Sequence, residues 1–169
     1  LGSRRLWPGD CGTALWTVTP SWSSGAHLSG FTFTVFEVLY DANNSIKLFY
    51  DGTNSRWTWR RRQGGANTDL NYSASVTAGT PVTIETRWPS SLGELVDLYG
   101  APTGSNRWRD LIINGTIVGS SQDVVPTEVD DSYLVLGGRE AEQFDGYIKG
   151  QIAPYVLSAN ACAKWRLSS

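Results

Sequence analysis

Charged residues, cysteine and long apolar runs are scarce in this sequence, and each scarcity excludes a class of protein. Charged residues make up 18% of the 169 residues, and the formal net charge is -2. No basic field therefore exists that would gather nucleic acid or an anionic membrane surface. No apolar run approaches the roughly 20 residues that a membrane-spanning helix requires. We expect neither nucleic-acid binding nor membrane insertion.

Residues that carry catalysis or bind metal are also few. The sequence has one histidine, His27, and two cysteines, and it lacks methionine even at the first position, which suggests a processed product or a piece of a larger chain. No Cys/His cluster, Gly-x-Ser-x-Gly elbow or Walker-type glycine run is present to indicate a zinc site, a serine hydrolase or a nucleotide site. A single histidine in a Ser-Gly-Ala-His-Leu-Ser turn is typical of a solvated loop.

What the sequence does contain is apolar alternation with a period of two, which is typical of β-strands. In residues 31–40, apolar residues alternate with threonines up to Val35, and the phase then switches at Phe36. Such a switch predicts a core strand that is bulged or covered on both faces. No segment of ten or more residues shows a helical apolar stripe, apart from the C-terminus, where a short helix is an alternative.

Turn residues divide these strands into three predicted hairpins. The hairpins join 46–50 to 56–60 through Asp51-Gly52, 70–76 to 82–88 through Ala78-Gly79-Thr80-Pro81, and 111–113 to 116–118 through Asn114-Gly115. The third signal is the strongest, because Asn-Gly tolerates the positive φ angles of a type I′ turn. Further strands are expected at 133–136 and 147–156. This pattern predicts an all-β, two-sheet antiparallel jelly-roll sandwich that forms one domain over residues 1–169.

The second half of the chain carries a family resemblance. The segments concerned are Asp110-Leu-Ile-Ile-Asn-Gly-Thr-Ile-Val-Gly119, Tyr133-Leu-Val-Leu-Gly-Gly138 and Phe144-Asp-Gly-Tyr-Ile-Lys-Gly-Gln-Ile152. In this order and spacing they resemble the laminin G-like and pentraxin-like jelly rolls of the concanavalin A-like lectin/glucanase superfamily. The resemblance covers roughly residues 13–158 and implies a domain of the kind found in secreted proteins and in phage or virus particles. Residues 89–108 depart from the pattern, and we expect an inserted loop or hairpin there.

The superfamily includes hydrolases as well as lectins, so the catalytic carboxylates decide between them. Hydrolases of this fold resemble one another in a Glu-x-Asp-x-x-Glu strand, whose alternation directs the carboxylates into one cleft. The nearest segment here has Glu128 and Asp130, but Tyr133 stands in place of the second glutamate. We therefore expect no enzymatic activity, and a carbohydrate-active hydrolase with an unusual site is the alternative. No cofactor is expected, although the resemblance implies calcium as an alternative, because some relatives hold it through loop oxygens.

The two cysteines are Cys11 and Cys162, near the two ends of the chain. In the resembling folds the terminal strands lie side by side, so the resemblance implies a disulfide between them. A bridge that closes so long a loop would stabilise the fold and would indicate assembly outside a reducing cytosol. We expect an extracellular or virion-surface protein, and two buried thiols in an intracellular protein are the alternative.

Tryptophan is unusually abundant, with eight residues in the chain. Lectin sites pair aromatic platforms with amide, carboxylate and guanidinium hydrogen bonds. The candidate ligand-binding residues in or next to the insertion are Tyr99, Asn106, Arg107, Trp108 and Arg109, and a second candidate is Arg61, in the arginine run that follows two tryptophans. Trp57 and Trp88 are predicted to be core residues instead, because they occupy alternating strand positions. The arginine run is then a solvated strand edge or an ion-pair contact to a neighbour.

These observations favour a non-enzymatic, lectin-like recognition or adhesion domain that binds glycan as part of a larger extracellular or virion-surface assembly. The alternative is a purely structural decoration domain of a viral capsid or phage tail, whose partners are neighbouring subunits of the particle or further copies of the chain. The two readings are compatible, since a decoration domain can also adhere to surface glycans.

Overall fold

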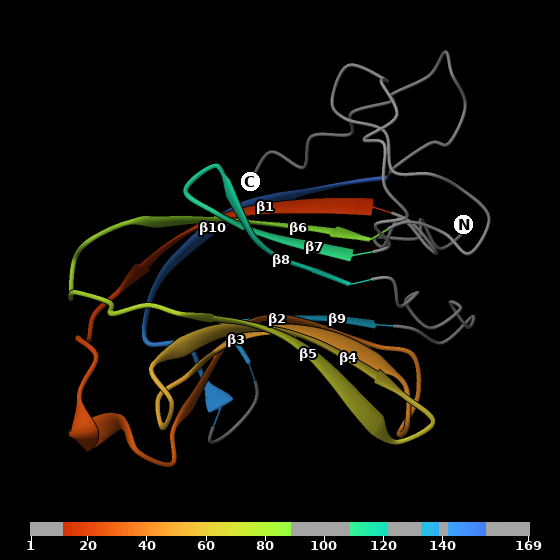
Figure 1. Cartoon of the computed structure of the whole chain (residues 1–169), viewed down its shortest axis with the longest axis horizontal. Coiled ribbons are helices and arrows are strands. Elements are labelled where there is room, and N and C mark those ends of the chain that lie inside the picture. Colours follow the sequence, from red (N-terminus) through yellow and green to blue (C-terminus); the bar gives the residue numbers. More distant parts are fainter. Residues whose placement is uncertain (1–11, 89–108, 122–132, 139–141, 155–169) are drawn as a thin grey trace, which may run out of the picture.

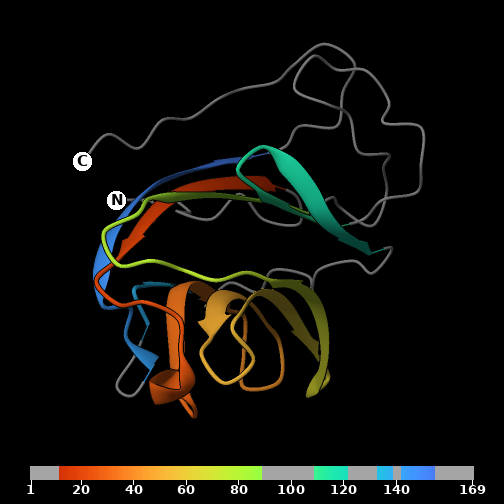
Figure 2. The same ribbon diagram turned by 60° about the vertical axis from the view of Figure 1, so that its left-hand side comes forward.

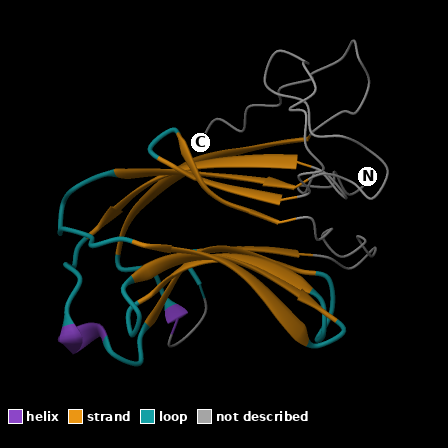
Figure 3. Cartoon of the chain, in the orientation of Figure 1, coloured by secondary structure: helices purple, strands orange, loops and turns teal. Residues whose placement is uncertain are grey.

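The computed structural model describes residues 12–88, 109–121, 133–138 and 142–154. These residues form ten strands and one short 3₁₀ helix, η1 (Ala26–Leu28). The strands lie in two antiparallel five-stranded sheets that stack face to face (Figure 1, Figure 3). No helix among the described residues is long and apolar enough to cross a membrane.

The two sheets are named sheet A and sheet B here. Sheet A has the strand order β10-β1-β6-β7-β8, formed by β10 (Gly146–Pro154), β1 (Gly12–Pro20), β6 (Val82–Trp88), β7 (Arg109–Ile113) and β8 (Thr116–Ser121). Sheet B has the order β5-β4-β3-β2-β9, formed by β5 (Ala66–Ser73), β4 (Arg56–Gln63), β3 (Ser45–Asp51), β2 (Thr32–Leu39) and β9 (Tyr133–Leu136). The predicted two-sheet antiparallel jelly-roll sandwich is confirmed.

Local predictions that depended on turn chemistry and phase are also confirmed. The phase switch in β2 is a register shift between Thr34 and Phe36, where β2 pairs with β3. In the β7–β8 hairpin, Asn114 and Gly115 have φ angles of 48° and 80°, which are the positive values that a type I′ turn requires. The predicted insertion at 89–108 and the C-terminal helix lie outside the described residues.

The predicted hairpin between residues 70–76 and 82–88 is wrong. β5 pairs with β4 in sheet B, whereas β6 pairs with β1 and β7 in sheet A, so residues 74–81 connect one sheet to the other. Turn residues mark where a chain changes direction, but they do not specify the strand with which each neighbour pairs. The hairpin partner of β5 is β4, through Gly64 and Gly65 at φ angles of 56° and 83°.

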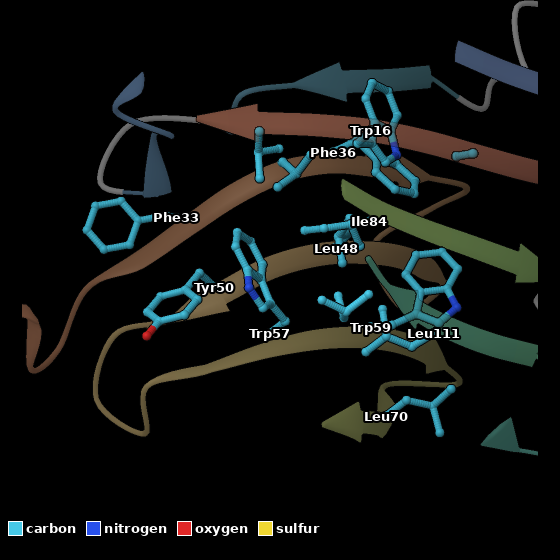
Figure 4. Packing of buried hydrophobic residues seen from close by; sticks show 14 of the residues in the cluster. Trp16, Phe33, Phe36, Leu48, Tyr50, Trp57, Trp59, Leu70, Ile84 and Leu111 are labelled. Carbon is cyan, nitrogen blue, oxygen red and sulfur yellow. The ribbon is translucent and has the colours of Figure 1, made fainter. Parts of the chain in front are cut away.

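Aromatic side chains fill the space between the sheets (Figure 4). Trp57 and Trp59 are both 0% exposed, which confirms the prediction that Trp57 belongs to the core, while the side chain of Trp88 lies outside the described set. The ring of Phe36 links the two sheets, because its centroid lies 5.1 Å from that of Trp16 in sheet A and 5.5 Å from that of Trp59 in sheet B. Burial of such large rings is a main source of stability for a fold of this size.

Gly150 gives Trp16 the room it occupies. The two residues are direct cross-strand partners in β10 and β1, and a Cβ atom on Gly150 would lie 1.9 Å from Cε3 of the indole. We expect Gly150→Ala to lower the free energy of unfolding by about 2 kcal/mol, because the indole must leave its position against Phe36. Urea unfolding checks this, with Lys149→Ala, an exposed position on the same strand, as the control. Equal stability of the two variants would contradict the packing described.

Candidate functional site

Sheet B is curved, and its strands bend away from sheet A at both ends, so that its outer face is concave (Figure 1, Figure 2). Successive side chains of a strand point to opposite faces of a sheet. On β4, Trp57 and Trp59 point into the core, which places Thr58 and Arg60 on the concave face. The same alternation holds for β3, where Leu48 is in the core and its neighbours point outward.

Strand register brings outward side chains from β2, β3, β4 and β5 into rows across this face. One row, called the charged row here, consists of the successive cross-strand partners Glu37, Lys47, Arg60 and Asp69. The next, called the mixed row, consists of Thr34, Phe49, Thr58 and Asn71. Carboxylate, ammonium, guanidinium, hydroxyl and amide groups from four strands thus lie on one face of the sheet. The members from β2 and β3 and Thr58 of β4 are buried, so Arg60, Asp69 and Asn71 are the accessible ones.

Arg60 and Asp69 form the most ordered contact of the charged row. Nε of Arg60 donates to Oδ1 of Asp69, and Nη2 donates to Oδ2, both at 2.8 Å. Such bidentate pairs are strong and geometrically specific. The hydrogen bonds to Asp69 raise the pKa of Arg60 further above its usual value, outweighing the effect of partial burial. Arg60 therefore stays charged, and its two hydrogen bonds hold it in a fixed orientation against Asp69.

Phe49 lies beneath the cations and is only 5% exposed. The Nζ atom of Lys47 lies 5.3 Å from the centre of its ring, and Cζ of Arg60 lies 5.0 Å from it. Lys47 also forms an ion pair with Glu142, which follows β9 and is 95 positions away in the sequence. Phe49 therefore supports Lys47 and Arg60 through cation–π contacts and is not an open stacking platform.

The solvent-exposed part of the face lies over β5 and the end of β4. Asn67, Asn71 and Ser73 of β5 and Arg62 of β4 are exposed. The hydroxyl of Thr58 donates to Oδ1 of Asn71 at 2.9 Å, which fixes the orientation of the amide. Exposed amides beside a fixed guanidinium–carboxylate pair can bind hydroxyl groups in several directions at once.

At one end of the face, Asp51 accepts hydrogen bonds from the backbone and side chain of Asn54 at 3.1 and 2.7 Å, and from Nε of Arg56 at 3.1 Å. Partial burial is the largest single influence and acts to raise the pKa of Asp51. The hydrogen bonds from Asn54 and the charge of Arg56 together outweigh it, so the pKa lies below its ordinary value. This carboxylate is therefore also ionised at neutral pH.

The structure places only two of the sequence-predicted ligand residues. Arg109 is completely buried on β7; its Nη1 donates to the carbonyl of Trp59 and its Nη2 to the carbonyl of Thr68, each at 3.1 Å. Arg61 lies on the same face of β4 as Trp57 and Trp59 and so points away from the concave face. The candidates that lie outside the described residues are Tyr99, Asn106, Arg107, Trp108, the cysteines Cys11 and Cys162, and the acidic Glu128 and Asp130.

Sequence reasoning missed Arg60, Asp69 and Asn71. A signal for Arg60 was present, because the alternation that predicts Trp57 in the core also predicts Arg60 on the opposite face. Among the described residues, no group of three or more His, Cys, Asp or Glu side chains is placed to hold a metal ion. His27 lies exposed in η1.

No family model and no curated protein matches the sequence. Similar solved structures include domain 4 of AbnA, a GH43 extracellular arabinanase from Geobacillus stearothermophilus, in complex with arabinotriose, at 18% identity and a TM-score of 0.59 over 87% of this chain and 61% of that chain. The CBM40 of the Ruminococcus gnavus IT-sialidase, bound to α2,3 sialyllactose, matches at 16% identity and a TM-score of 0.60 over 90% of this chain and 80% of that chain. Domains LG4-5 of the mouse laminin α1 chain match at 14% identity and a TM-score of 0.56 over 94% of this chain and 41% of that chain.

The present chain thus spans less than two thirds of the arabinanase domain and of the laminin fragment. At identities this low, likeness concerns the arrangement of the strands and leaves the ligand undetermined. The two five-stranded sheets and these matches lead to one conclusion: the chain has the concanavalin A-like jelly-roll fold that these domains share.

Proposed function

We propose that this chain is a non-catalytic glycan-binding module whose ligand lies on the concave face of sheet B, over Arg60, Asp69 and Asn71. The observation that carries the proposal is the bidentate Arg60–Asp69 pair beside the oriented amide of Asn71. Adjacent sugar hydroxyls present donors and acceptors at short, fixed spacings, and rigid planar groups bind them without a large loss of side-chain entropy.

The structural neighbours support a glycan ligand. The arabinanase domain is described in complex with arabinotriose and the sialidase module bound to sialyllactose, so two proteins of this fold hold oligosaccharides. The arabinanase is also described as extracellular, which supports a secreted location for this chain. Membership of a virion or other particle, with neighbouring subunits as partners, stays a prediction.

Arg60→Ala is expected to raise the dissociation constant for a bound oligosaccharide at least about tenfold, because a charge-assisted hydrogen bond contributes about 1.5–3 kcal/mol. The ligand is first identified on a glycan array, and affinities are then measured by isothermal titration calorimetry. Thr68→Ala, on the same strand as Asp69 but on the opposite face of the sheet, is the matched control and should bind as the unchanged chain does. Equal affinity of the Arg60 variant would move the site away from the concave face.

The same experiment separates the other readings. Loss of binding in Trp108→Ala but not in Arg60→Ala would place the site at the insertion, with Asn106, Arg107 and Tyr99 as its neighbours. No binding to any glycan at millimolar concentration would favour a structural decoration domain. Reducing sugar released from a polysaccharide panel, and lost on Glu128→Gln, would show a hydrolase instead.

A further inference from the structure

We infer that the ligand of the concave face is a neutral oligosaccharide, and that sialylated, uronic acid-containing or sulfated glycans are disfavoured. This inference rests on the proposed function, because it concerns the same face. It follows from the way in which the charges of that face are paired with one another.

The charges on the face balance. Among the described residues, its basic members are Lys47, Arg56, Arg60 and Arg62, and its acidic members are Glu37, Asp51, Asp69 and Glu142. Three of the cations contact a carboxylate directly: Arg56 contacts Asp51 at 3.1 Å, Arg60 contacts Asp69 at 2.8 Å, and Lys47 contacts Glu142. The remaining cation, Arg62, is exposed near the turn between β4 and β5.

An anionic group gains little from cations that are already paired. A carboxylate or sulfate brought to Arg60 also approaches Asp69, whose two oxygens lie at the same guanidinium, so attraction and repulsion largely cancel. Juxtaposed like charges at an interface disfavour the wrong partner. A specific site for an acidic sugar needs instead a cation with its planar donors unspent.

A neutral sugar hydroxyl fits the same pair well. A hydroxyl both donates and accepts, so it can donate to Asp69 while a neighbouring hydroxyl accepts from Arg60. The exposed groups of β5, which are Asn67, Asn71 and Ser73, are uncharged and add further donors and acceptors. With Phe49 covered by Lys47 and Arg60, recognition on this face is through hydroxyl patterns and not through a charge or an open ring.

The test uses matched pairs of glycans that share a core, such as lactose and α2,3 sialyllactose, or neutral and glucuronic acid-substituted xylo-oligosaccharides. An array is probed with the full chain, and the affinities of the hits are measured at about 50 and 500 mM NaCl. We expect neutral members to bind, with affinities that change less than about twofold with salt, because no net charge is neutralised on binding. Preference for the acidic members, weakening at high salt, would overturn the inference and leave the glycan-binding proposal intact. No binding to any member would overturn both.

A gain of function gives the sharper result. Asp69→Asn keeps the shape of the side chain and frees Arg60 from its counter-charge, so affinity for the acidic members should rise at least about fivefold. Asp51→Asn, which frees Arg56, is the second variant and should act in the same direction if the first fails to fold. The matched control is Glu85→Gln, which removes the acidic partner of Arg87 at 2.6 Å in sheet A and should give no gain. If the Asp69→Asn variant folds but binds the acidic glycans no more tightly than the unchanged chain does, Asp69 does not shield Arg60 from anionic ligands.

Discussion

Trp59→Ala is expected to lower the free energy of unfolding by about 4 kcal/mol, as full truncation of a buried tryptophan does. The indole is completely buried in β4 and lies near both Phe36 and the guanidinium of Arg109, with 6.0 Å between its ring centre and Cζ of Arg109. Removing it leaves a cavity between the sheets that the paired strands on both sides of β4 cannot close. This loss is a large part of the total stability of an ordinary domain, about 5–15 kcal/mol.

Chemical denaturation monitored by circular dichroism measures the effect of Trp59→Ala. The control is Arg62→Ala, on the same strand but exposed, which should change stability by no more than about 0.5 kcal/mol. If the two variants unfold at the same denaturant concentration, the indole does not fill the space between the sheets as described.

Arg109→Ala is expected to destabilise the fold by about 3 kcal/mol, which corresponds to a fall in Tm of about 6–12 °C for a chain of this length. Its side chain extends from β7 in sheet A to the carbonyls of Trp59 and Thr68 in sheet B, so it ties the two sheets together. Arg109→Lys should restore little, because a compact ammonium group lacks the planar fork that serves two acceptors.

Calorimetry on the two Arg109 variants also tests the role that the sequence suggested for this residue. A fall in Tm with glycan affinity retained in the folded fraction supports the structural role. Unchanged melting with glycan binding lost would show that Arg109 contacts the ligand, as its place beside Trp108 suggested, and would contradict the buried geometry.

The parts of the fold that could be predicted are those set by neighbours in the sequence. Alternation of apolar residues predicted the strands and placed Trp57 in the core. Asn114-Gly115 predicted a turn because the positive φ angles of a type I′ turn depend only on its two central residues. Pairing between distant segments could not be predicted in this way. β5 and β6 follow one another in sequence, yet they lie in different sheets, and only the tertiary arrangement decides this.

The candidate site also depends on pairing between distant segments, and this is why the sequence did not predict it. Glu37, Lys47, Arg60 and Asp69 form one row only because β2, β3, β4 and β5 pair in a particular register, and a shift of one residue would turn each side chain to the other face. Sequence composition drew attention to tryptophan, whereas the tryptophans described in sheet B are enclosed in the core. The polar residues that remain on the concave face have no local motif.

The pairing of the first described strand with the last has a consequence for biosynthesis. Every residue of β1 from Gly12 to Pro20 has its partner between Gly146 and Pro154, so this pairing closes a loop that includes nearly the whole described chain. During translation β1 emerges before β10, and one of its hydrogen-bonding edges stays unsatisfied until β10 leaves the ribosome. Contacts so distant in sequence form slowly, and a product truncated before β10 would leave that edge of β1 open to association with other chains.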